Sequence, residues 1–225
     1  MKRLVLLGEG HGEVSGLPVL ARKVLRDKNG EDLFRIDYEV IRAHNADGLV
    51  RWDKQANKED FSEWHKFVNY AARRPNLGGV LAVFDGDAKT FPTGKKDPFC
   101  AKIAAKKMAL TATEIGAGAT FSLAVVFACV EYETWLIAGI NETTVNDGPF
   151  RGLKFPTGVP ESHGKGWLER SLTSYRPTRD QKRLTDALDL QIVRAKKLRS
   201  FLRLEPAIDQ LLAAAHTGNH VATPE

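Results

Sequence analysis

The sequence predicts an α/β fold: a mainly parallel sheet of about four strands, helices on both faces and a C-terminal helical cap. Three short apolar runs, at residues 4–7, 80–84 and 121–130, lack the polar alternation of a half-exposed strand, so we expect strands buried on both faces. Stretches with helical spacing separate them. Strands that alternate with helices are typical of a parallel sheet covered on both sides.

The first part of the chain supplies two expected strands and two expected helices. Residues 4–7 form a strand, and helical spacing from Val14 to Asn29 predicts the helix after it. Polar and apolar residues alternate over 35–43, which predicts a half-buried strand. Residues 44–59 are polar and contain Gly and Asn, so we expect a loop, and a helix starts at Asp60.

The second part begins with the strand that ends at Asp85. A loop rich in Lys, Pro and Gly covers residues 88–98, and helical spacing predicts a helix over 99–115. The apolar run 121–130 predicts a buried strand that leads directly into a helix over 131–138.

The pattern changes after Gly139. Residues 140–166 hold many Gly, Pro, Asn and Thr residues, which indicates an irregular connection. Helical spacing then predicts short helices at residues 167–172, 180–188, 190–202 and 205–215. We therefore divide the chain into an α/β core, residues 1–139, a connection with a helical cap, residues 140–215, and a frayed tail, residues 216–225.

Composition narrows the class of protein. The chain has 225 residues, a formal charge of +5 and a pI near 9.2, which agrees with a polyanionic partner. Its cysteines, Cys100 and Cys129, show no Cys-x-x-Cys spacing, so we expect neither a disulfide framework nor a zinc site. The apolar run near the N-terminus is too short for a signal peptide, and 121–130 is too short to cross a membrane. These features predict a soluble, cytoplasmic protein without a membrane partner.

Acidic residues follow each of the three buried strands. Functional groups of a parallel sheet gather at the carboxyl ends of its strands. Two carboxylates that converge to ~4 Å repel each other by ~4 kcal/mol at an effective dielectric constant of ~20. A hard divalent cation, Mg²⁺ or Mn²⁺, would offset that repulsion. The expected metal ligands are Glu9, Glu13, Asp85, Asp87, Glu131 and Glu133.

Two pairs of these carboxylates depend on local structure. Asp85 and Asp87 point the same way if the chain is extended. Glu131 and Glu133 share a face in a strand but diverge on a helix, so either one can reach the site.

The first loop permits a second interpretation. Gly10 and Gly12 flank His11 and would let the loop approach a ligand or metal closely. With Gly16 they also resemble a loosened dinucleotide-binding fingerprint, but the neighbouring glutamates would repel a pyrophosphate and no Walker lysine follows. His11 itself is either a metal ligand or proton donor, or an exposed loop residue.

Several motifs carry a family resemblance. The segments Glu9-Gly10-x-Gly12-Glu13, Asp85-x-Asp87 and Glu131-Tyr132-Glu133-Thr134-Trp135-Leu136 resemble the Toprim-like family catalogued as domain of unknown function 4276. The segments Tyr175-Arg176-Pro177-Thr178 with Gln181, and Arg199-Ser200-Phe201, extend the likeness over most of the chain.

This resemblance implies a Toprim-like fold with a catalytic site for phosphodiester chemistry. It implies Mg²⁺ or Mn²⁺ bound by Asp85 and Asp87, with Glu9 as a further ligand or as general acid or base. It also implies a nuclease of bacterial anti-phage defence that works with an ATPase partner. The alternative is a non-catalytic subunit that binds metal or nucleic acid and serves the same partner.

Lysines after the central strand are the expected contacts to nucleic acid, either DNA or RNA. They are Lys89, Lys95, Lys96 and Lys102. Phosphate contacts of this kind would make binding salt-dependent. The same lysines also fit a solvated helix face and loop. The oligomeric state and the number of metal ions, one or two, stay open.

Overall fold

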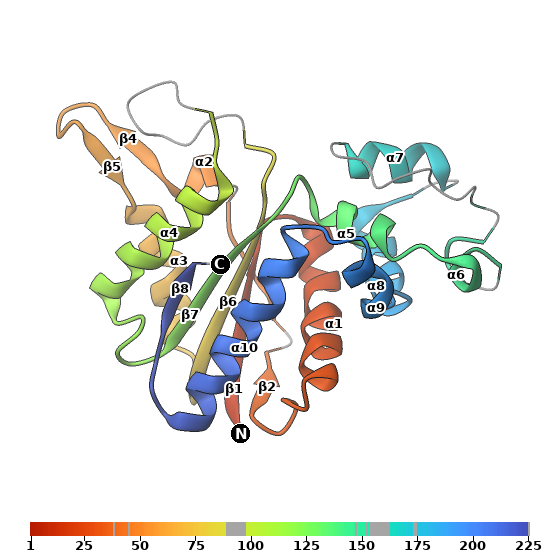
Figure 1. Cartoon of the computed structure of the whole chain (residues 1–225). Helices are drawn as coiled ribbons and strands as arrows, with labels where there is room; N and C mark the ends of the chain where they lie inside the picture. The colour runs from red at the N-terminus through yellow and green to blue at the C-terminus, as the bar shows by residue number, and fades with distance from the viewer. Residues whose placement is uncertain are drawn as a thin grey trace.

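The centre of the molecule is a parallel sheet. This computed structural model describes the chain except for Tyr38, Asn45, 89–97, Asp147, Gly152, 154–162, 173–174 and Glu225. The strand order is β2-β1-β6-β7-β8, and β3 also pairs with β1 (Figure 1). The sheet strands are β1 (Lys2–Gly8), β2 (Phe34–Ile36), β3 (Ile41–Arg42), β6 (Leu77–Asp85), β7 (Ser122–Ala128) and β8 (Ala222–Pro224). All pairings in this sheet are parallel, which confirms the predicted α/β class, although the described sheet has six strands rather than about four.

The three long strands end at the same edge of the sheet. Gly8 of β1 is paired with Val83 of β6, and Asp85 of β6 with Ala128 of β7. Residues that directly follow these strands therefore lie near one another, which is the placement that the sequence predicted for the acidic residues.

Alternate residues of the sheet pack against different helices. Leu4 and Leu6 belong to the apolar cluster that includes α1 and α10, whereas Val5 and Leu7 belong to the cluster that includes α3 and α4. This is the period of two that a strand buried on both faces requires. The helices are α1 (His11–Asp27) and α10 (Phe201–Thr217) on one face, and α3 (Ser62–Ala72) and α4 (Ala101–Ala112) on the other.

α5 (Tyr132–Ala138) follows β7, within the residues that the sequence assigned to the core. The predicted cap, residues 140–215, contains four short helices in its described part, whereas its expected last helix is α10, which packs on the sheet. The short helices, called the cap below, are α6 (Glu142–Asn146), α7 (Gly164–Ser171), α8 (Pro177–Asp186) and α9 (Leu190–Ala195). Figure 1 shows them gathered beside α1, and α8 packs along α1. None of the helices in the described part of the chain is long and apolar enough to cross a membrane.

Two expectations for residues 35–59 were wrong. The single strand predicted over 35–43 is divided into β2 and β3, both paired with β1. The predicted loop contains α2 (Ala46–Leu49) and an antiparallel hairpin of β4 (Arg51–Asp53) and β5 (Lys58–Asp60). Its turn is held by the Asp53 carboxylate, which accepts the N–H groups of Gln55 and Ala56. A side chain that caps its own turn lets a polar hairpin form without an apolar pattern.

The C-terminal region also differs from expectation. The helix predicted over 190–202 ends at Ala195, Lys197 has a left-handed φ of 53°, and α10 then begins at Phe201. Ala222–Pro224, part of the tail expected to fray, instead form β8, which pairs with the outer edge of β7. Val221 O accepts Leu123 N–H at 2.7 Å, and Ala222 to Pro224 continue the pairing.

Candidate metal centre

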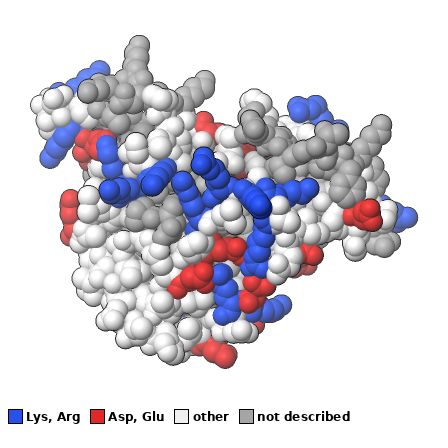
Figure 2. All heavy atoms as spheres, in the orientation of Figure 1, with Lys and Arg blue, Asp and Glu red and all other residues white. Residues whose placement is uncertain are grey.

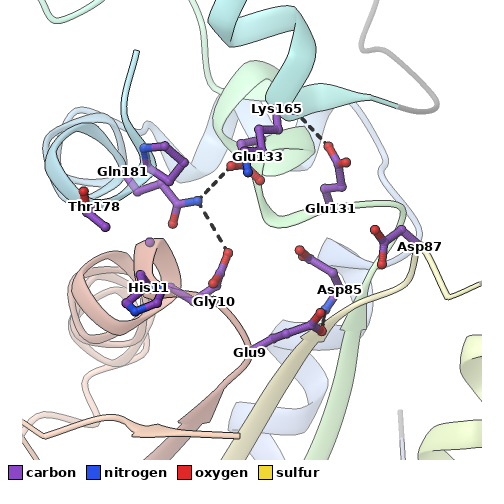
Figure 3. A pocket seen from close by; sticks show the side chains of 13 residues that line it. Glu9, Gly10, His11, Asp85, Asp87, Glu131, Glu133, Lys165, Thr178 and Gln181 are labelled. Atoms are coloured by element: carbon purple, nitrogen blue, oxygen red, sulfur yellow. Dashed lines mark hydrogen bonds between the residues drawn. The ribbon is translucent and has the colours of Figure 1, made fainter. Parts of the chain in front are cut away.

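One cavity is lined by all the carboxylates that the sequence placed at the sheet edge. It has a volume of about 450 Å³ and lies where β1 and β6 end and where α1 and α5 begin, with α8 across it (Figure 3). Its acidic lining residues are Glu9, Glu13, Asp85, Asp87, Glu131 and Glu133. Lys165 is the one lysine among the described lining residues, so the cavity is strongly acidic.

Three of these carboxylates converge more closely than the rest. Glu13, Asp85 and Glu133 each offer an oxygen within 4.8 Å of the other two. Glu13 is 5% exposed and Glu133 is 3% exposed, so both are removed from bulk water. A buried group of carboxylates is costly unless a proton or a cation neutralises it. This group could hold a metal ion.

Asp85 is fixed by the backbone around it. It is the last residue of β6, and its Oδ1 accepts the N–H of Tyr132, the first residue of α5, at 2.7 Å. Its own backbone N–H donates to Glu9 Oε2 at 3.2 Å. Glu9 therefore links the ends of β1 and β6 instead of belonging to the group of three.

The glycines of the first loop make room for protein side chains. A Cβ atom on Gly10 would lie 2.2 Å from Glu13 Oε2, and one on Gly12 would lie 2.3 Å from Gln181 Cδ. The sequence suggested that these glycines admit a ligand, but in the structure they admit Glu13 and Gln181. A pyrophosphate over Gly12 would have to displace Gln181, which disfavours the dinucleotide interpretation.

The cap supplies hydrogen-bond donors to the carboxylates. Gln181 Nε2 donates to Glu133 Oε1 at 2.9 Å and to Glu13 Oε1 at 3.4 Å, and the Tyr175 hydroxyl donates to Glu133 Oε1 at 3.1 Å. The sequence pointed to Tyr175 and Gln181 only through the family resemblance and gave them no role at the site. A helix start at Pro177, with a polar residue one turn later, is the local signal that could have drawn attention to them.

Two buried oxygens of this site have no hydrogen-bond partner among the described residues. They are Glu13 Oε2 and Gln181 Oε1. Buried polar atoms are almost always paired with protein, water or an ion. The unpartnered oxygen of Glu13, in a set of hard oxygen donors, fits a divalent cation such as Mg²⁺ or Mn²⁺.

The electrostatics of the group follow from burial and from mutual repulsion. Burial, followed by the charges of Glu13, Glu133 and Glu9, raises the pKa of Asp85 well above its usual range, although the Tyr132 N–H partly opposes this. Burial also raises the pKa of Glu133, and Glu13 adds to the effect. Without a cation, therefore, the group favours binding of protons.

The remaining predicted ligands line the cavity outside the group of three. Asp87 is exposed, because β6 ends before it. Glu131 precedes the first turn of α5, and its Oε2 accepts the backbone N–H of Lys165 at 2.9 Å. His11 is exposed and its Nε2 lies 2.6 Å from Arg42 Nη1, which as a guanidinium can only donate.

The predicted nucleic-acid contacts are only partly described. Lys102 is exposed in the first turn of α4. Lys89, Lys95 and Lys96 lie outside the described residues.

The segment Arg199-Ser200-Phe201 contacts α5, the helix that carries Glu133. Ser200 Oγ accepts Trp135 Nε1–H at 2.9 Å, and the rings of Trp135 and Phe201 pack edge to face with centroids 5.6 Å apart. Trp135 lies on α5 with Glu133, so these contacts fix the helix that carries one of the carboxylates.

The fold and this cavity define an α/β protein with a buried acidic group that could hold a metal ion. Comparison of the chain with known protein families, with curated proteins and with solved structures gives no match.

Proposed function

We propose that this chain is a Mg²⁺- or Mn²⁺-dependent nuclease that hydrolyses phosphodiester bonds of DNA or RNA. The observation that carries the proposal is the convergence of Glu13, Asp85 and Glu133 to within 4.8 Å, with Glu13 Oε2 buried and unpartnered. Carboxylate oxygens are the ligands of choice for hard divalent cations.

The residues divide into ligands and proton carriers. Glu13, Asp85 and Glu133 would hold the ion, which supplies charge neutralisation and an activated water when bound. Asp87, exposed just beyond β6, is the carboxylate that can accept a proton from an attacking water. Glu9 orients the end of β6 through the Asp85 N–H and is the second candidate for general acid or base.

Basic side chains on the surface favour a polyanionic substrate. Figure 2 shows a band of Lys and Arg side chains across one face of the molecule, over α4 and the start of α10. Lys102 and Lys106 of α4 and Arg199, which precedes α10, are exposed. Each phosphate contact made by such residues would release counterions, so binding would weaken as salt rises.

The wider role rests on the motifs that resemble the Toprim-like family. We propose that the nuclease acts in bacterial anti-phage defence together with an ATPase partner. The exposed basic band is open to nucleic acid, and the proposal needs no membrane partner.

Burial of the expected metal ligands favours a second candidate function. Glu13 and Glu133 are 5% and 3% exposed, as expected for an ion with a structural role. In that case the chain is a non-catalytic subunit that binds metal or nucleic acid beside an ATPase.

One experiment separates these functions. Purified protein is incubated with plasmid, single-stranded DNA and tRNA in Mn²⁺ or in EDTA. The nuclease cleaves in Mn²⁺ only, Asp85→Asn and Glu13→Gln lose cleavage, and Asp32→Asn retains it. Asp32 is a matched control because it is exposed in the turn beyond the far end of α1. Mn²⁺ binding without cleavage would favour the non-catalytic subunit, and equal cleavage by all variants would place the activity elsewhere.

A further inference from the structure

Gln181 of the cap contacts two of the three carboxylates of the acidic group, those of Glu13 and Glu133. It lies on α8, is 1% exposed, and donates to Glu13 on α1 and to Glu133 on α5; the dashed lines at Gln181 in Figure 3 mark these hydrogen bonds. Glu13 and Glu133 lie on separate helices, and the Gln181 side chain is a hydrogen-bond donor that both carboxylates share.

The orientation of the Gln181 amide is set by its partners. Nε2 carries two N–H donors, and both carboxylates lie on its side, with Glu133 Oε1 at 2.9 Å and Glu13 Oε1 at 3.4 Å. With both carboxylates ionised, as around a bound ion, the reversed amide would place its oxygen against two carboxylate oxygens that cannot donate. The amide itself is uncharged and does not titrate.

The hydrogen bonds from Gln181 determine which carboxylate oxygens remain available to bind an ion. Gln181 holds Oε1 of Glu13 and Oε1 of Glu133 on the side of α8, and it leaves Glu13 Oε2 buried without a partner. Asp85 is held in the same manner, because its Oδ1 accepts the Tyr132 N–H. Each ligand thus has one oxygen occupied by a protein donor, and the second oxygen of Glu13 is buried without a partner among the described residues.

A second set of contacts fixes the position of Gln181 itself. Thr185 Oγ1 donates to the backbone oxygen of Gln181 at 2.7 Å and lies 3.0 Å from the Tyr132 hydroxyl. Because the single Thr185 proton is used for Gln181, Tyr132 must donate to Thr185. Tyr132 is on α5, so α8 is attached to the helix that carries Glu133.

We propose that Gln181 is a positioning residue of the metal centre: it orients Glu13 and Glu133 for the ion and so makes docking of α8 on the core part of metal binding. This inference rests on the metal centre proposed above. Side chains that orient metal ligands commonly change metal affinity about 10- to 100-fold when they are replaced.

The test is Mn²⁺ binding by titration calorimetry, with Gln181→Met, which has similar size but no donor. We expect Mn²⁺ affinity to fall about 10- to 100-fold. Gln191→Met, at an exposed glutamine of α9, is the matched control and should bind as wild type does. If Gln181→Met does not fold, Gln181→Asn replaces it, since the shorter side chain keeps an amide but withdraws it from both carboxylates.

A second readout distinguishes positioning from packing. Mn²⁺ should slow backbone hydrogen exchange of α8 in the wild type but not in Gln181→Met, while α3 on the other sheet face should be unchanged in both. Wild-type affinity in a folded Gln181 variant would overturn this inference and leave the metal centre standing. Absence of Mn²⁺ binding in the wild type would overturn both.

Discussion

The side chain of Asp85 accepts the backbone N–H of Tyr132 at 2.7 Å, which joins the end of β6 to the first residue of α5. An asparagine at position 85 can keep this bond, because its carboxamide oxygen is also an acceptor. Asp85→Asn therefore removes the negative charge from the acidic group and preserves the link between strand and helix.

This variant tests the charge of the site without metal. The pKa of Asp85 is raised from its ordinary 3.8, so the folded state binds the proton of this carboxyl more tightly than the unfolded state does. The stability that this proton contributes is fully present below pH 3.8 and is lost as the pH rises through the folded-state pKa. In EDTA at about pH 8 we expect Asp85→Asn to melt a few degrees above the wild type, corresponding to about 1 kcal/mol. The difference should disappear near pH 3 in circular-dichroism melting curves. A variant that melts lower than the wild type at high pH would show that the Asp85 anion is stabilised in the folded state.

Metal binding should stabilise the folded chain. An ion that binds only the folded state adds about 2.7 kcal/mol at a concentration of about 100 times its Kd. We expect the melting temperature to rise with Mn²⁺ for the wild type and for Asp32→Asn, but not for Glu13→Gln. The glutamine is isosteric and can still accept from Gln181 through its oxygen, so the variant removes charge with little change in packing. Equal stabilisation of Glu13→Gln in a thermal-shift titration would place the ion outside the acidic group.

The long strands were predictable, but the short ones were not. Residues 122–128 are apolar throughout and buried, so the sequence alone marks β7. β2, β3 and β8 have two or three residues each, too few to show a period. They are strands because β1 and β7 offer unpaired backbone groups to them, and this depends on the assembled sheet.

The site was predictable in its residues but not in their grouping. β6 ends at Asp85, so the extended geometry that would align Asp85 with Asp87 stops between them. α1 begins at His11 rather than near Val14, which places Glu13 in its first turn, with its side chain directed back toward the helix start. The contact between Gln181 and Glu13 spans 168 positions and has no local sequence signal.

The first turn of α1 is sensitive to any added side chain at Gly12. A Cβ atom there would lie 2.3 Å from Gln181 Cδ, so Gly12→Ala must displace Gln181 or α8. We expect a loss of about 1–3 kcal/mol in urea unfolding and weaker Mn²⁺ binding. Gly166→Ala is the control, because its Cβ would meet only the end of Arg170 at 3.4 Å and His163 Cβ at 4.0 Å. A fully stable Gly12→Ala with normal Mn²⁺ affinity would show that α8 need not sit against this turn.

Asp180 precedes Gln181 and holds the start of α8. Its Oδ2 accepts the N–H of Arg176 at 2.8 Å and Arg179 Nη2–H at 2.7 Å. The hydrogen bond from Arg179 is the largest influence on the pKa of Asp180 and lowers it, and burial opposes the shift.

Because the pKa of Asp180 is lowered, its effect on stability depends on pH in the opposite sense to that of Asp85. The stabilisation by Asp180 is present above its ordinary value of 3.8 and is lost as pH falls through the lower folded-state pKa. We expect Asp180→Asn to cost about 1 kcal/mol in guanidinium unfolding near pH 7, and progressively less as the solution is acidified below that value. Asp186→Asn, at the exposed C-terminal end of the same helix, should be neutral or slightly stabilising, because a negative charge is unfavourable there. Because α8 carries Gln181, Asp180→Asn should also weaken Mn²⁺ binding near pH 7. Unchanged binding in a measurably destabilised variant would mean that the metal centre tolerates a loosened α8.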